Sequence, residues 1–154
     1  MKKFLKIAVL LAVVVIIALQ FIRPSFTNPA IVAGRAIEDS IPVPAEVQMV
    51  ISRSCNDCHS NKTLYPWYSQ ISPFSWFLAG HIDDGRRELN FSEWNTYSDT
   101  KKARKLEEIC ELVEAGGMPL PSYLWIHRDA VLTSHQRKLI CDWAKAERSK
   151  FPVE

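Results

Sequence analysis

The 154-residue sequence lacks the features of several large fold classes. It has no segment that alternates apolar and polar residues with the period of two expected of half-buried strands, and it has neither an internal repeat nor a low-complexity segment. Apolar residues recur instead at helical spacing, as in Leu106, Ile109, Cys110 and Val113. We therefore predict an all-α fold.

Excess basic charge is also missing from most of the chain. The sequence has 19 basic and 17 acidic residues. Lys2, Lys3, Lys6 and Arg23 lie in the first 23 residues, which contain no acid, so the rest has 15 basic against 17 acidic residues. A slightly acidic domain lacks the positive field that attracts nucleic acid, and we predict no nucleic-acid partner.

The first 23 residues contain an uncharged apolar run, from Ile7 to Ile22, between a lysine-rich start and Arg23-Pro24. This is the pattern of an export signal. No clear small-residue cleavage pattern closes the run, and Phe4 to Ile22 is about long enough to cross a bilayer. We predict a transmembrane signal anchor at 1–23, with the following domain attached to the cell membrane on the periplasmic, extracytoplasmic side. A cleaved signal peptide is the alternative.

The remaining chain divides into a linker and one domain. Residues 24–43 contain three prolines and little apolar periodicity, which is typical of a linker. Residues 44–150 are enough for a single core. Helix signals in this domain include Pro44 at an expected start, Gly116-Gly117 at an expected end, and Thr133 with Gln136 as a capping box.

The most specific motif is Cys55-Asn56-Asp57-Cys58-His59. C-x-x-C-H is the attachment signature for c-type haem. One helical turn brings the two thiols to one side, with the imidazole beside them. The motif predicts one haem c per chain, bound covalently by Cys55 and Cys58, with His59 as a ligand of the iron. Such attachment takes place outside the cytoplasm, which agrees with an exported domain.

Other uses of the cysteines receive less support. A thioredoxin-like redox pair would require a βαβ pattern, and a zinc site would require a second close pair. Cys110 and Cys141 are far apart in sequence. An oxidising compartment favours a disulfide between them, whereas their positions on the expected helices oppose it, so both alternatives remain open.

Met118 is the predicted sixth iron ligand. It follows a helix end and opens the segment Met118-Pro119-Leu120-Pro121, whose prolines restrict the backbone. A thioether ligand favours Fe(II) and raises the reduction potential. His81 is the main alternative ligand, and His127 or an open coordination position remain further alternatives.

Residues 40–146 resemble the bacterial haem-binding domain family. The resemblance is carried by Cys55–Asn61, Tyr65–Ser69, Pro73, Ser75-Trp76, His81-Ile82, Gly85-Arg86, Leu89–Trp94, Met118-Pro119, Tyr123, His127, Ala130, Leu132-Thr133 and Trp143. It implies a cytochrome c-like helical domain with covalent haem on Cys55 and Cys58 and iron-bound His59. The Met-Pro element is similar to the distal Met loop of monohaem cytochromes c, which implies Met118 as an axial ligand.

These features predict a membrane-anchored, monohaem c-type cytochrome-like protein that transfers electrons to and from redox partner proteins and is not an enzyme. Two alternatives require a labile or open sixth position on the iron. One is a haem-based redox or gas sensor, and the other is a peroxidase-like enzyme in which His81 with Asp83 or Asp84 serves as acid and base.

Overall fold

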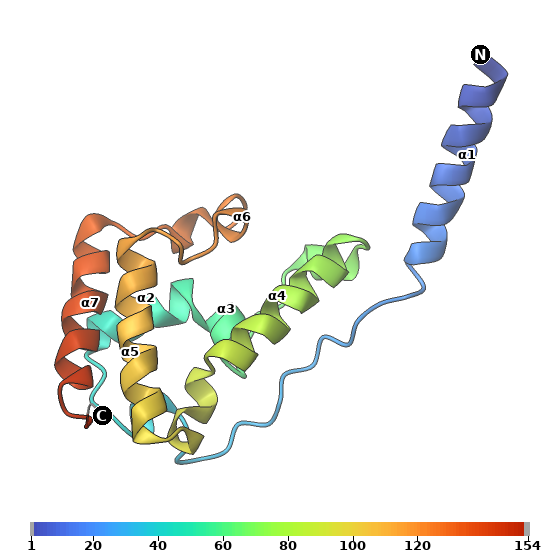
Figure 1. The fold of residues 1–154 in the computed structure, drawn as a ribbon. Helices are drawn as coiled ribbons and strands as arrows, with labels where there is room; N and C mark the ends of the chain where they lie inside the picture. Colours follow the sequence, from blue (N-terminus) through green and yellow to red (C-terminus); the bar gives the residue numbers. More distant parts are fainter. Residues whose placement is uncertain (1, 153–154) are drawn as a thin grey trace.

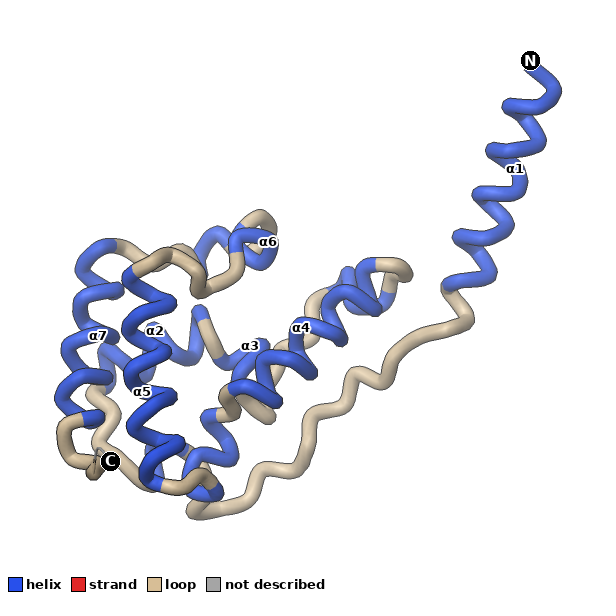
Figure 2. The backbone as a smooth tube through the Cα atoms, viewed as in Figure 1, coloured by secondary structure: helices blue, strands red, loops and turns tan. Residues whose placement is uncertain are grey.

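The computed structural model describes residues 2–152, and none of these residues lies in a strand (Figure 2). The α-helices are α1 (Lys2–Leu19), α2 (Ala45–Ser54), α3 (Asn56–His59), α4 (Phe74–Glu88), α5 (Asp99–Glu114), α6 (Pro121–Leu124) and α7 (Ser134–Arg148). Short 3₁₀-helices are η1 (Ile37–Asp39), η2 (Trp67–Gln70), η3 (Phe91–Thr96) and η4 (Arg128–Ala130). The predicted all-α fold is confirmed.

The predicted transmembrane helix at 1–23 is wrong. Helix α1 stands apart from the other helices (Figure 1), and no helix within residues 2–152 is both long and apolar enough to cross a membrane. Helix α1 ends at Leu19, and its first turns carry Lys2, Lys3 and Lys6. The uncharged part, residues 7–19, spans about 20 Å at about 1.5 Å per residue, whereas a bilayer core is about 30 Å thick.

The segment between α1 and α2 runs extended beneath α4 toward the main helical body (Figure 1). Hydrogen bonds attach it along its length. The Gln20 side chain bonds the backbone N–H and C=O of Ser72, both at 3.0 Å. Asn28 donates to the carbonyl of Thr63 at 3.0 Å. Residues 24–43, predicted as a linker, therefore contact the domain that they precede.

Helices α5 and α7 lie side by side and antiparallel, and α2 packs against α7 (Figure 1). The largest fully buried side chain is Trp94 of η3, and Leu106 of α5 is also completely buried. Helix α7 begins with the predicted capping box, in which the side chains of Thr133 and Gln136 each bond the other residue's backbone N–H. The segment that carries Met118 follows the end of α5, one helix of this pair.

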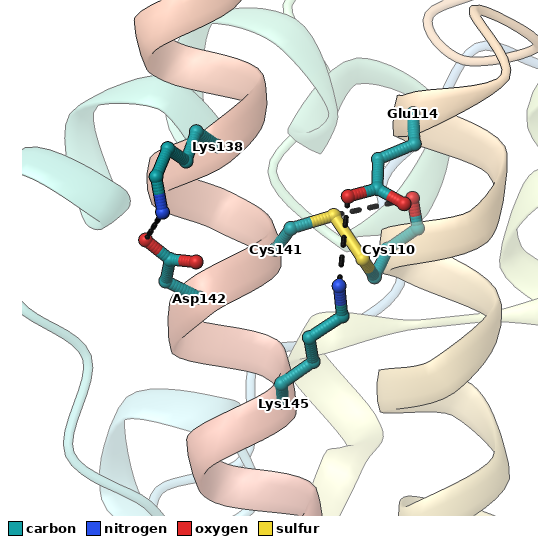
Figure 3. Close-up of a disulfide and its surroundings, with 6 residues drawn as sticks. All are labelled: Cys110, Glu114, Lys138, Cys141, Asp142 and Lys145. Atoms are coloured by element: carbon teal, nitrogen blue, oxygen red, sulfur yellow. Dashed lines mark hydrogen bonds and ion pairs between the residues drawn. A yellow bond between two sulfur atoms is a disulfide. The ribbon is translucent and has the colours of Figure 1, made fainter.

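Cys110 and Cys141 form a disulfide that joins α5 to α7 (Figure 3). Both residues are buried. The sequence pattern places Cys141 off the apolar face of its helix, which argued against this pairing. In the structure, Ile140, Cys141 and Ala144 are all buried, so the buried face of α7 is wider than the sequence pattern indicated.

Loss of this disulfide should lower the stability of the domain. It joins residues 31 positions apart, and a cross-link of that span contributes about 3–4 kcal/mol in the chain-entropy model. We expect a thiol reductant to lower the free energy of unfolding in urea. The control is the Cys110→Ala/Cys141→Ala variant, which should already be less stable and should not respond to reductant. Equal stability with and without reductant would contradict the expected contribution.

Candidate haem site

The C-x-x-C-H motif forms a single helical turn between α2 and α4. Helix α2 ends at Ser54 and α3 begins at Asn56. The backbone N–H groups of Cys58 and His59 both donate to the carbonyl of Cys55, at 3.2 and 2.9 Å. Cys55 and Cys58 are both free thiols and half-buried. The turn therefore holds two sulfurs and one imidazole in a compact group.

A cavity of about 290 Å³ adjoins this turn. Its walls contain the two thiols, His59, His81 and Met118, so the predicted attachment residues and both leading candidates for the sixth ligand line one space. His127 is not among the lining residues. The other walls are formed by Ser54, Asp57, Asp84, Gly85, Glu88, Pro119, Leu120 and Tyr123.

The orientation of the His59 ring is fixed by α4. Its Nδ1 lies 3.0 Å from the carbonyl oxygen of Gly85 and 3.0 Å from that of Leu89. Carbonyl oxygens only accept, so Nδ1 carries the proton and Nε2 keeps its lone pair for a metal. Burial lowers the pKa of His59, which favours the neutral imidazole, the form that binds metals.

The two motif thiols are held in their neutral form. Burial, with a smaller contribution from Cys58, raises the pKa of Cys55 to about 12. Burial and the negative charge of Asp57, partly offset by Arg86, raise the pKa of Cys58 to about 11. The sulfurs of the predicted thioether links are likewise uncharged.

Met118 is positioned by the end of α5. Gly116 adopts a φ of +72°, a left-handed conformation that ends the helix without the steric cost a side chain would bring. The backbone N–H groups of Gly117 and Met118 then donate to the carbonyl of Leu112, at 2.9 and 3.1 Å. The chain turns back across the cavity, Met118 is half-buried, and Pro119 is buried.

The donors around the cavity fit a haem. His59 offers one neutral nitrogen, Met118 and His81 are candidates for a second ligand, and the two neutral sulfurs of Cys55 and Cys58 line the same cavity. The hydroxyl of Ser54, also on the wall, is buried without a hydrogen-bond partner, so the cavity retains an unused polar group.

Residues 14–146 match the model of a family described as a haem-binding domain. The chain belongs to this haem-binding domain family. The match begins within α1 and includes the segment at 24–43. Comparison with the curated proteins and with the solved structures gives no significant match. Haem is therefore the group that this domain binds.

Helix α4 packs closely on the C-x-x-C-H turn of this haem-binding domain. A Cβ atom added at Gly85 would lie 2.5 Å from the carbonyl oxygen of Cys58 and 3.0 Å from its Cβ. Only glycine permits this approach. The next residue, Arg86, donates from Nε to the carbonyl of Ser60 at 2.9 Å and from its guanidinium to Thr63 at 2.8 Å.

Asp57, at the second variable position of C-x-x-C-H, connects the turn to two other segments. Its Oδ1 accepts a bond from the backbone N–H of Leu64 at 3.1 Å, and its Oδ2 accepts one from the hydroxyl of Tyr123 at 2.8 Å. The roles of Asp57 and Arg86 were not predicted from the sequence. Asp57, Arg86 and Tyr123 all belong to the family resemblance, and the sequence pattern favoured a solvated helix face for Arg86, whereas the structure bonds it to Ser60 and Thr63.

Replacing Gly85 should damage the site, whereas replacing another glycine of the same helix should not. Gly85→Ala forces the backbone of Cys58 to move, and we expect a loss of about 1–3 kcal/mol in the free energy of unfolding. Gly80→Ala is the matched control, because a Cβ there meets nothing within 4 Å. It should be neutral or stabilise the helix by about 0.5–1 kcal/mol. Urea unfolding of both variants measures this, and equal effects would contradict the packing assigned to Gly85.

Proposed function

We propose that this haem-binding domain is c-type cytochrome-like and transfers electrons. The observation that carries the proposal is the single cavity that contains Cys55, Cys58, His59 and Met118. Cys55 and Cys58 would hold the haem through two sulfur–carbon bonds, each formed by addition of a thiol S–H across one vinyl group. His59 and Met118 are the two protein ligands of the iron in this proposal, with one haem per chain.

Bound haem supplies an iron that accepts and releases one electron. The protein would supply the two ligands of this iron and the cavity around the haem. His59 presents Nε2 because its Nδ1 is bonded to the carbonyls of Gly85 and Leu89, which also makes the imidazole a better donor. Met118 provides a neutral thioether, which favours the reduced state. If His59 and Met118 both bind the iron, no position would remain for a substrate, which fits an electron carrier.

The proposed location is outside the cytoplasm, with redox proteins as partners. Covalent haem attachment by the cytochrome c route takes place there, and the C-x-x-C-H turn supports that route. The pairing of Cys110 with Cys141 adds support, because disulfides persist in oxidising compartments.

A haem-based sensor or a peroxidase-like enzyme is the second candidate function. It is favoured by one observation, that His81 and Asp84 line the same cavity as Met118. His81 is half-buried, and its Nδ1 bonds the carbonyl of Phe77 at 2.9 Å, which leaves Nε2 for a ligand or a proton. In this alternative Met118 would not hold the sixth position permanently, and His81 would serve as a replacement ligand or as an acid–base group.

Absorption spectra of three variants should identify the sixth ligand. We expect Met118→Ala to abolish the weak far-red band of a Met–Fe(III) bond, while His81→Ala and the control Met49→Ala retain it. Met49 is a suitable control because it is exposed on α2 and absent from the cavity. Loss of a low-spin spectrum in His81→Ala, with no change in Met118→Ala, would assign the position to His81 instead.

Carbon monoxide and peroxide should distinguish an electron carrier from the second candidate. If Met118 occupies the sixth position, the reduced wild-type protein should bind carbon monoxide slowly and incompletely, and peroxide turnover should be negligible. Met118→Ala should bind carbon monoxide rapidly and serves as the positive control. Rapid binding or fast peroxide turnover by the wild type would contradict the carrier function and favour the sensor or enzyme.

A further inference from the structure

We propose that Tyr123 is a positioning residue for the sixth iron ligand, because the bond from its hydroxyl to Asp57 fastens the Met118 segment to the haem-attachment turn. This inference rests on the proposed function, in which Met118 binds the iron. Tyr123 does not itself bind the iron in this proposal. It acts by limiting how far residues 117–124 move away from the cavity.

Asp57 is a suitable anchor because its position relative to the haem is fixed by its neighbours in the motif. It lies between Cys55 and Cys58, the two proposed attachment residues, and directly precedes Cys58. Both of its carboxylate oxygens accept hydrogen bonds, from the Leu64 N–H and from the Tyr123 hydroxyl. A hydrogen bond to a charged acceptor is stronger than one between neutral groups. The Tyr123–Asp57 bond therefore joins two segments 66 residues apart at the edge of the cavity.

Hydrogen bonds hold both ends of the Met118 segment, residues 117–124. At its start, the Met118 N–H donates to the carbonyl of Leu112 on α5. At its end, the N–H of Tyr123 donates to the carbonyl of Leu120 at 3.0 Å, which closes α6, and the Tyr123 hydroxyl then reaches Asp57 at 2.8 Å. Without the second bond, α6 loses a charged hydrogen bond to the turn that carries the haem.

A stacking contact on one face of the Tyr123 ring also restrains the ring, with its hydroxyl directed toward Asp57. The ring stacks on His127 with centroids 4.1 Å apart and planes 8° from parallel. The Nε2 of His127 is 2.8 Å from the hydroxyl of Tyr68 on η2. Burial, together with the bond to Asp57, raises the pKa of Tyr123 and keeps the hydroxyl protonated as a donor.

Imidazole binding to the oxidised, haem-loaded protein tests this role. Added imidazole enters when the sixth ligand leaves, so its binding rate reports how often the Met118 segment opens. Tyr123→Phe removes only the hydroxyl, and we expect binding at least about tenfold faster, with unchanged haem content. Tyr65→Phe is the matched control, because its hydroxyl donates to Asn28, and it should keep the wild-type rate. Wild-type rates in Tyr123→Phe would overturn the proposal.

Two further variants separate positioning from general damage to the fold. Asp57→Asn retains an oxygen acceptor for the Tyr123 hydroxyl, and we expect a smaller acceleration than in Tyr123→Phe. Hydrogen exchange at residues 117–124 should become faster in Tyr123→Phe and stay unchanged across α5. In the Met118→Ala background, Tyr123→Phe should add nothing, because the segment no longer supplies the ligand. Additive effects in that double variant would overturn the proposal.

The same measurement distinguishes this inference from the proposed function. If Met118→Ala binds imidazole no faster than the wild type, Met118 is not the ligand, and both the ligand assignment and the role of Tyr123 fail. If Met118→Ala is faster but Tyr123→Phe is not, the ligand assignment stands and only the positioning role fails.

Discussion

The contact between α4 and the C-x-x-C-H turn at Gly85 is the constraint on which the haem site depends. At this point the helix approaches the carbonyl of Cys58 so closely that no side chain fits between them. The same glycine presents its carbonyl to Nδ1 of His59, and Arg86 beside it bonds the carbonyl of Ser60. One close approach thus sets the distance of the turn from α4, the tautomer of the imidazole and the path of the following loop.

Burial keeps the nitrogen and sulfur donors of the cavity in their neutral forms, beside the carboxylates of Asp57, Asp84 and Glu88 on its walls. The His59 imidazole is kept neutral, and the two motif thiols have pKa values raised far above neutrality. Met118 adds another uncharged sulfur on the wall. Neutral donors in a partly buried cavity fit haem, a large and mostly apolar group, which is what the family match indicates.

Features that depend on one turn of local backbone geometry could be predicted from the sequence. Features that depend on how distant segments pack against one another could not. The C-x-x-C-H motif and the Thr133 capping box require only local geometry. The Cys110–Cys141 disulfide depended on how α5 and α7 rotate against one another, which periodicity alone does not define. The Tyr123–Asp57 bond joins residues 66 positions apart, beyond the reach of any spacing rule.

The predicted membrane span failed for a different reason. Hydropathy marked an apolar run up to Ile22, but the helix itself begins with a lysine-rich turn and ends at Leu19. Where a helix ends depends on the backbone as well as on side-chain polarity. The capping box succeeded at α7 because side chains that bond the first turn mark a boundary directly, and α1 has no comparable signal at its end.

Mass spectrometry of the denatured protein is the most direct test of covalent haem attachment. The protein would be produced in a host that carries the c-type cytochrome maturation machinery. We predict a mass gain of one haem that survives denaturation and maps to a peptide containing Cys55 and Cys58. The Cys55→Ser/Cys58→Ser variant should lose it, and Cys110→Ala/Cys141→Ala should keep it. The mass of the polypeptide alone, or a haem released by denaturation, would contradict covalent attachment.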